Sequence, residues 1–176
     1  MIGSVWGTIH TILFTLRNPL IAGGVVLGGV LLGLGGWQAA KRFGWHRVPS
    51  VAAGISLGVV FGATFSRTLP DYSSMPGVVR RDRPFCYVDG FSMAGGNEMI
   101  NVLLFVPLVF FAVLAVRRTL VVAGAAIALS AAIELLQPLT HRGLCQTQDF
   151  LNNSAGTLVA AAAAAAVVAL SRRCSR

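Results

Sequence analysis

Charged residues are scarce in this sequence. Only 11% of its 176 residues are charged and 55% are hydrophobic, whereas a soluble globular domain usually carries about 25% charged residues. This scarcity excludes an ordinary soluble domain and predicts an integral membrane protein. Acidic residues are rarer than basic ones, with six Asp and Glu against fourteen Lys and Arg, so the net charge is +8. In a membrane protein such an excess sets the orientation and attracts anionic headgroups.

Residues that bind metals or act as nucleophiles are also few. The chain has three His and three Cys, and each histidine is isolated from a second metal ligand at usable spacing. The sequence shows neither a nucleophile elbow nor a phosphate-binding loop. Its arginines are scattered through short connections and do not form a basic patch with interleaved aromatic residues. We therefore expect no metal site, no cofactor and no nucleic-acid partner, and the sequence leans away from an enzyme without deciding the question.

The N-terminal segment has no Lys or Arg before its apolar residues, which argues against a secretory signal peptide. Apolar residues between Ile2 and Leu16 recur at spacings of three and four, which places them on one helical face. The pattern predicts an interfacial amphipathic helix over residues 1–17, with Trp6 as an anchor. An amphipathic helix packed at the edge of the protein explains the same pattern equally well.

Long stretches without charge divide the remainder of the chain. Five of them run for 18 to 23 residues, and only one is interrupted, by Glu134. A helix needs roughly 17–25 predominantly apolar residues to cross a bilayer. We therefore predict an all-α polytopic membrane protein in which residues 18–176 form a single domain, a compact bundle of five transmembrane helices. These helices are expected near residues 20–37, 50–66, 98–116, 120–137 and 153–170, with a long extracytoplasmic loop over residues 67–97.

The basic residues favour one orientation in the cell membrane. In this five-helix topology eight Lys and Arg residues fall on one side and six on the other. Because cytoplasmic loops carry the excess of basic residues, the N-terminus is expected outside and the C-terminus in the cytoplasm.

Two of the three cysteines fall on the outer side of this topology. Cys86 follows the second helix and Cys145 follows the fourth, whereas Cys174 lies on the opposite side. A disulfide between Cys86 and Cys145 requires an oxidising compartment, which agrees with the chosen orientation. Two unrelated free thiols are the alternative, because spacing alone cannot establish the bridge geometry.

Polar side chains gather at the outer end, where the third helix begins, the fourth ends and the fifth begins. Glu134 stands out because an ionised carboxylate inside the hydrocarbon boundary is costly unless it pairs or lines water. Arg142 could fold back to it as a bidentate partner. The functional interpretation is a polar pocket for a headgroup or a sugar-like ligand, and the alternative is a buried ion pair or amide network that fixes helix packing. The residues expected to bind the ligand are Asn101, Glu134, Gln137, Arg142, Asp149 and Asn153.

The start of the fifth predicted helix is unusually polar. Asp149 stands just ahead of it and Asn152 and Asn153 open it, and each residue type can cap exposed backbone N–H groups. Three candidate caps exceed what one helix start needs, so at least one is expected to face a partner.

Several short motifs resemble those of the VanZ-like family of membrane proteins. They occur in order over roughly residues 60–165: RTLP at Arg67–Pro70, NVLLFVPL at Asn101–Leu108, IELLQ at Ile133–Gln137, HR at His141–Arg142 and DFLNNSAG at Asp149–Gly156. One departure is Val109, where the family pattern usually has glycine. The family's namesake is associated with resistance to teicoplanin-type glycopeptide antibiotics. The resemblance therefore implies a small helical protein of the cell envelope.

Three functions fit these observations. The first is a non-enzymatic module that contacts membrane lipid and binds a cell-envelope ligand, either a lipid-linked cell-wall precursor or a lipoglycopeptide, at the outer face. The second is a membrane-embedded enzyme acting on a lipid-linked substrate, with Glu134 and Asp149 as its candidate acid and base and His141 or Arg142 holding an anion. The third is a helix-packing scaffold for a partner membrane protein. The sequence leaves the oligomeric state open.

Overall fold

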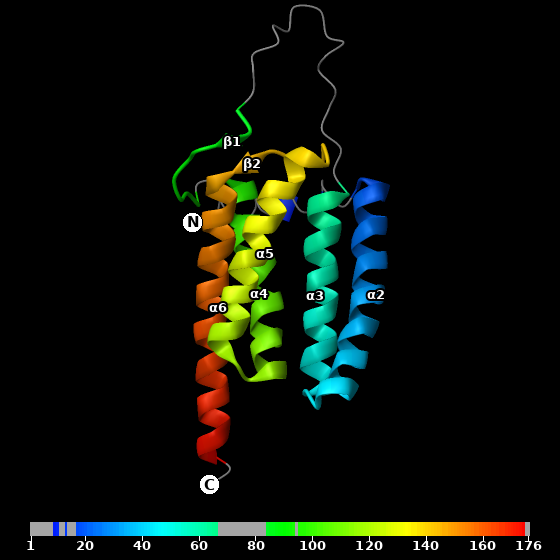
Figure 1. Cartoon of the computed structure of the whole chain (residues 1–176), viewed down its shortest axis with the longest axis vertical. Helices are drawn as coiled ribbons and strands as arrows, with labels where there is room; N and C mark the ends of the chain where they lie inside the picture. Colours follow the sequence, from blue (N-terminus) through cyan, green and yellow to red (C-terminus); the bar gives the residue numbers. More distant parts are fainter. Residues whose placement is uncertain (1–8, 11–12, 14–16, 67–83, 94, 175–176) are drawn as a thin grey trace, which may run out of the picture.

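The structure is a computed structural model that describes residues 9–10, 13, 17–66, 84–93 and 95–174. Within these residues five helices are long and apolar enough to cross a membrane, and they run side by side along the long axis of the molecule (Figure 1). The prediction of an all-α polytopic membrane protein with five spanning helices is therefore confirmed. The helices are α2 (Pro19–Phe43), α3 (Arg47–Phe65), α4 (Gly96–Val116), α5 (Thr119–Leu139) and α6 (Thr147–Cys174).

Two predicted segments fall largely on residues that the structure does not describe. The interfacial helix over residues 1–17 is one of them, and it stays a prediction; of its described residues Ile9, His10 and Leu13 are helical and exposed. The long loop over residues 67–97 is the other, described at residues 84–93 and 95, while its last two residues belong to α4.

The fifth spanning helix begins earlier than the sequence suggested. α6 starts at Thr147 rather than at residue 153, so Asn152 and Asn153 lie inside the helix and are not its N-caps. Asp149 lies in the first turn, where a carboxylate complements the positive end of the helix dipole. The interpretation of all three residues as candidate caps was therefore wrong for the two asparagines. Pro138 lies inside the last turn of α5, which continues to Leu139.

Glycines allow α2 and α3 to pack as a close antiparallel hairpin. A side chain at Gly58 would collide with the backbone of Gly28, and one at Gly62 would collide with the backbone of Val25. Small residues at such positions let helix backbones approach within the membrane, where packing rather than the hydrophobic effect drives association. At the turn between the two helices, Gly44 is the C-cap of α2, and its φ of 70° lies in the left-handed region that favours glycine.

The core lies where α3, α4, α5 and α6 meet. Its largest fully buried apolar side chains are Val60, Phe105, Val109, Val113 and Ile133. α6 contributes small residues to this core, because Ala160, Ala161 and Ala164 of its alanine run are buried there. Near its start α6 touches α4 so closely that a side chain at Gly156 would collide with the carbonyl oxygen of Val102.

α6 is also the longest of the five spanning helices, with 28 residues. At 1.5 Å per residue its length is about 42 Å, compared with about 30 Å for the hydrocarbon core of a bilayer. Figure 1 shows its C-terminal end extending beyond the ends of the neighbouring helices.

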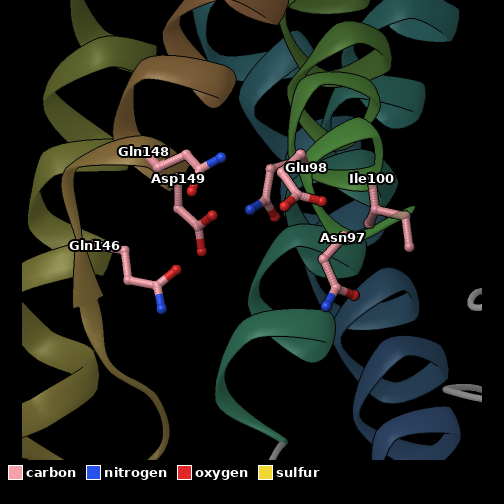
Figure 2. Close-up of a pocket in the computed structure, with 7 residues that line it drawn as sticks. Asn97, Glu98, Ile100, Gln146, Gln148 and Asp149 are labelled. Atoms are coloured by element: carbon pink, nitrogen blue, oxygen red, sulfur yellow. The ribbon is translucent and has the colours of Figure 1, made fainter. Parts of the chain in front are cut away.

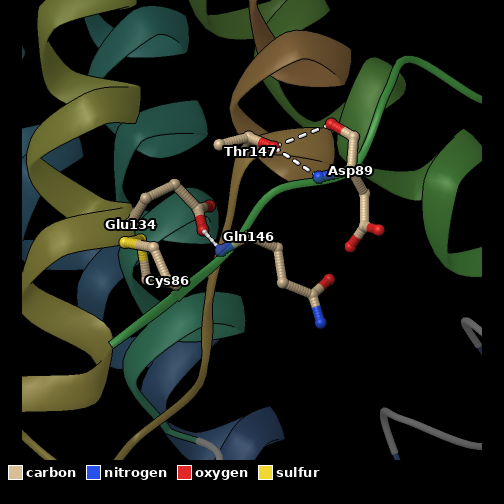
Figure 3. The surroundings of a disulfide bond; sticks show 6 residues. Cys86, Asp89, Glu134, Gln146 and Thr147 are labelled. Atoms are coloured by element: carbon tan, nitrogen blue, oxygen red, sulfur yellow. Dashed lines mark hydrogen bonds between the residues drawn. A yellow bond between two sulfur atoms is a disulfide. The ribbon is translucent and has the colours of Figure 1, made fainter. Parts of the chain in front are cut away.

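A short covalently closed cap covers the opposite end of the bundle. Strand β1 (Cys86–Tyr87) pairs in parallel with strand β2 (Cys145–Gln146), and a disulfide joins Cys86 to Cys145, whose Cα atoms are 4.5 Å apart. The predicted disulfide is thus confirmed, whereas the strand pair was not predicted. Just beyond the strands, the Thr147 hydroxyl donates to the Asp89 carbonyl oxygen at 2.7 Å and accepts from the Asp89 N–H at 2.8 Å (Figure 3).

Candidate functional site: a polar pocket between α4 and α6

A polar pocket of about 200 Å³ lies at the capped end of the bundle, where α4 and α6 begin. Figure 2 shows the side chains of the two segments facing each other across it. Six of the seven lining side chains are polar, in a bundle whose outer surface is mainly apolar. The lining residues are Asn97, Glu98, Ile100 and Asn101 from α4, and Gln146, Gln148 and Asp149 from β2 and the first turn of α6.

The α4 wall of the pocket follows from helical spacing. Asn97 and Asn101 are four residues apart and Glu98 and Asn101 are three apart, so their side chains share one face of the helix. The N-cap of α4 is Gly95, which has no side chain to cap the helix. The carboxylate of Glu98 lies against Gly95, three positions after the cap, where an acidic side chain suits the positive helix end.

The α6 wall is held in place from behind by Glu134. This residue lies in α5 and is only 5% exposed, and its Oε2 accepts a hydrogen bond of 3.1 Å from the backbone N–H of Gln146 (Figure 3). The disulfide at Cys145 fixes the neighbouring backbone. Glu134 therefore positions a lining residue rather than lining the pocket itself, and the Arg142 guanidinium expected to pair with it is exposed.

Two buried asparagines join α6 to its neighbours just inside the pocket. The Asn152 Nδ2 atom donates to the backbone carbonyl of Glu98 in α4 at 3.4 Å. The Asn153 Nδ2 atom donates to the hydroxyl of Ser130 in α5 at 3.0 Å. Their side chains are 0% and 4% exposed, which agrees with the expected amide network that fixes helix packing.

Several buried oxygen atoms in this region have no hydrogen-bond partner among the described residues. They are Oδ1 of Asn152 and of Asn153, and the hydroxyl oxygens of Ser154 and Thr157. Buried polar atoms are normally satisfied by protein or by ordered water. Since Asn152 is linked to Glu98, which lines the pocket, these acceptors extend the polar region from the pocket into the bundle.

The predicted ligand-binding residues separate into three groups. Asn101 and Asp149 line the pocket, while Glu134 and Asn153 are buried and hold its walls through hydrogen bonds. Gln137 and Arg142 are not among the lining residues: the Gln137 side chain packs against Gly143, and the Arg142 backbone N–H donates to the Gln137 carbonyl at 3.0 Å. Of the two candidate catalytic carboxylates only Asp149 reaches the pocket.

Five lining residues were absent from the predicted set: Asn97, Glu98, Ile100, Gln146 and Gln148. The signal for Glu98 was its spacing of three residues from Asn101. Glu98 lies on the α4 wall of the pocket, across from Asp149 (Figure 2). Within the residues described, no group of three or more His, Cys, Asp or Glu side chains is placed to hold a metal ion.

Comparison with known proteins gives one finding. A family model described as VanZ/LLP1 matches residues 50–169, a range that contains every residue lining the pocket, the disulfide and nearly all of α3 to α6. No curated protein and no solved structure matches the chain.

Proposed function

The chain belongs to the VanZ/LLP1 family, and from this premise we propose that it binds a cell-envelope ligand in the pocket between α4 and α6. The candidate ligands are a lipid-linked cell-wall precursor and a lipoglycopeptide, and binding would contribute to glycopeptide resistance or envelope homeostasis. The observation that carries the proposal is the pocket, a cluster of amide and carboxylate side chains at one end of an apolar bundle.

The chemistry of the lining side chains favours the sugar or peptide part of such a ligand. Four amides offer both hydrogen-bond donors and acceptors, and the two carboxylates, when ionised, act as acceptors alone. None of the seven lining residues is basic, so the pocket suits hydroxyl, amide and amine groups better than a phosphate. Apolar side chains on the lipid-facing surfaces nearby, such as Leu103 and Leu158, are exposed and can accept a lipid tail.

The distribution of charge supports an outward-facing pocket. In the five-helix topology eight of the fourteen Lys and Arg residues fall on the side opposite the pocket and six on the pocket side, whereas all six Asp and Glu residues fall on the pocket side. Under the positive-inside rule this excess favours a cytoplasmic location for the more basic end. The disulfide beside the pocket agrees with an oxidising, extracytoplasmic location.

Binding to pocket variants tests the proposal. We expect Asn101→Ala and Gln148→Ala each to weaken binding of a fluorescent lipoglycopeptide or of a lipid-linked precursor about fivefold to tenfold, since each removes roughly one hydrogen bond worth about 1 kcal/mol. The matched control is Gln38→Ala, an exposed glutamine in α2 outside the pocket. The assay uses full-length protein in lipid nanodiscs, with antibiotic susceptibility of cells as a second readout. Unchanged binding and susceptibility in correctly folded pocket variants would overturn the proposal.

A second candidate is an enzyme acting on a lipid-linked substrate. The observation in its favour is the pair of carboxylates, Glu98 and Asp149, on opposite walls of the pocket (Figure 2), an arrangement that suits general acid–base chemistry. Turnover of a lipid-linked substrate by purified protein, lost in both Glu98→Gln and Asp149→Asn, distinguishes catalysis from binding alone.

A further inference from the structure

A second cavity lies at the basic end of the bundle, away from the polar pocket. It is an apolar groove of about 300 Å³ between α2, α3 and α4. Its lining is almost wholly apolar, and its one hydroxyl, that of Ser50, already donates to the His46 carbonyl at 2.8 Å. Because the groove is formed by three membrane-spanning helices, its apolar walls are at a depth where hydrocarbon chains surround the protein.

One end of this groove lies next to an aromatic and a cationic residue. Trp45 and Val116 line it, and the residues that follow them in the chain are His46 and Arg117. The Arg117 Nε–H donates to His46 Nε2 at 3.2 Å, and both side chains are exposed. This bond uses one of the five N–H donors of the guanidinium. Tryptophan is enriched at the level of lipid headgroups, which agrees with a groove mouth at the membrane boundary.

Other groups at this end add to the positive charge. They are Lys41, Arg42, Arg47 and Arg118 at the neighbouring helix ends, and the Lys41 ammonium lies 3.7 Å from the centre of the Trp37 ring. All the acidic residues that the structure describes lie at the pocket end of the bundle. Each Lys or Arg near a membrane surface contributes about 1 kcal/mol of attraction to anionic lipids.

We propose that this groove binds an acyl chain of one anionic phospholipid, whose phosphate contacts Arg117. Polarity and charge are complementary: the chain occupies the apolar groove, and the headgroup meets the guanidinium donors at its mouth. Arginine presents a planar fork of donors that matches phosphate oxygens. The site is separate from the polar pocket in position and chemistry, so neither proposal depends on the other.

One glycine allows the groove to be filled without disturbing the helices. Gly35 lines the groove, and a Cβ atom added there meets nothing within 4 Å. A leucine at this position therefore extends into the volume that the acyl chain is proposed to occupy. The matched control is Gly23→Leu in the same helix, because Gly23 also has open space around it but does not line the groove.

The headgroup contact is tested with a substitution that preserves the backbone. Arg117 ends α4 with a φ of 58°, in the left-handed region, and asparagine tolerates that region better than most residues. Arg117→Asn therefore removes the cation and retains the helix end. Arg173→Asn, near the C-terminal end of α6, removes one cation from the same side of the membrane and serves as the control.

The experiment is native mass spectrometry of the full-length protein, with phosphatidylglycerol and phosphatidylcholine of identical chains as probes. We expect the wild-type protein to bind one phosphatidylglycerol in preference to phosphatidylcholine. The affinity for phosphatidylglycerol should fall about tenfold in Gly35→Leu and about fivefold to tenfold in Arg117→Asn, and it should be unchanged in both controls. Thermal melting establishes that each variant is folded. Equal binding of the two lipids, or equal losses in variant and control, would overturn the proposal. So would a dimer of this chain that is lost in Gly35→Leu while lipid binding persists.

Discussion

Breaking the Cys86–Cys145 disulfide is expected to lower the free energy of unfolding by an amount that depends on the number of residues between the two cysteines. The bridge joins residues 59 positions apart, and the chain-entropy relation gives about 4 kcal/mol for a loop of that size in a freely unfolding chain. The membrane reduces this value, because α4 and α5 lie between the two cysteines and stay inserted when tertiary contacts are lost. We therefore expect about 2 kcal/mol, near the lower end of measured disulfide contributions.

The assay is thermal unfolding of the full-length protein in nanodiscs with and without reductant. A loss of about 2 kcal/mol corresponds to a fall in Tm of about 4–8 °C for a chain of this size. A Cys86→Ala, Cys145→Ala double variant should melt at the reduced temperature and ignore reductant, whereas Cys174→Ser should keep the full response. If thiol labelling shows complete reduction and the Tm of the wild-type protein does not move, the bridge contributes no net stability and the reasoning is wrong.

Two further substitutions test the packing around the pocket. Gly156→Ala should cost about 1–3 kcal/mol in the free energy of unfolding, because the new methyl group overlaps the α4 backbone. Gly124→Ala in α5, where a Cβ meets nothing within 4 Å, should be neutral or slightly stabilising, so equal effects would contradict this account of the helix contact. Glu134→Leu should cost about 1–3 kcal/mol by leaving the Gln146 N–H without its acceptor, while Glu134→Gln retains an acceptor oxygen. If chemical unfolding gives the leucine and glutamine variants the same free energy of unfolding, Glu134 does not position Gln146 in this way.

The number and approximate places of the spanning helices were predictable because membrane thickness fixes the length of an uncharged stretch. The start of α6 was not, since hydropathy treats every polar residue as lying outside the hydrocarbon. Gln148 and Asp149 are indeed at the boundary, but Asn152 and Asn153 are buried against other helices, where hydrogen bonds to Glu98 and Ser130 offset their polarity. Whether a polar side chain faces lipid or protein depends on tertiary packing, which a hydropathy count does not contain.

The candidate site was predictable in location and only partly in membership. Helix ends on one side of the membrane must share a depth, and this placed Asn101 and Asp149 together. Glu98 was absent from the predicted set, although its helical spacing from Asn101 puts it on the same face. The pairing of β1 with β2 left no trace in the sequence, because two-residue strands are too short to show an alternating pattern.

The length of α6 has a practical consequence for determining the structure experimentally. A membrane protein of only 176 residues offers few features by which single particles can be aligned in electron microscopy. α6 continues as an unbroken helix to Cys174, past the ends of its neighbours (Figure 1). A rigid soluble helical protein fused in register to this end would prolong the same helix, so its orientation would be fixed relative to the bundle. The fusion point lies at the opposite end from the polar pocket, which leaves that pocket open to added ligands.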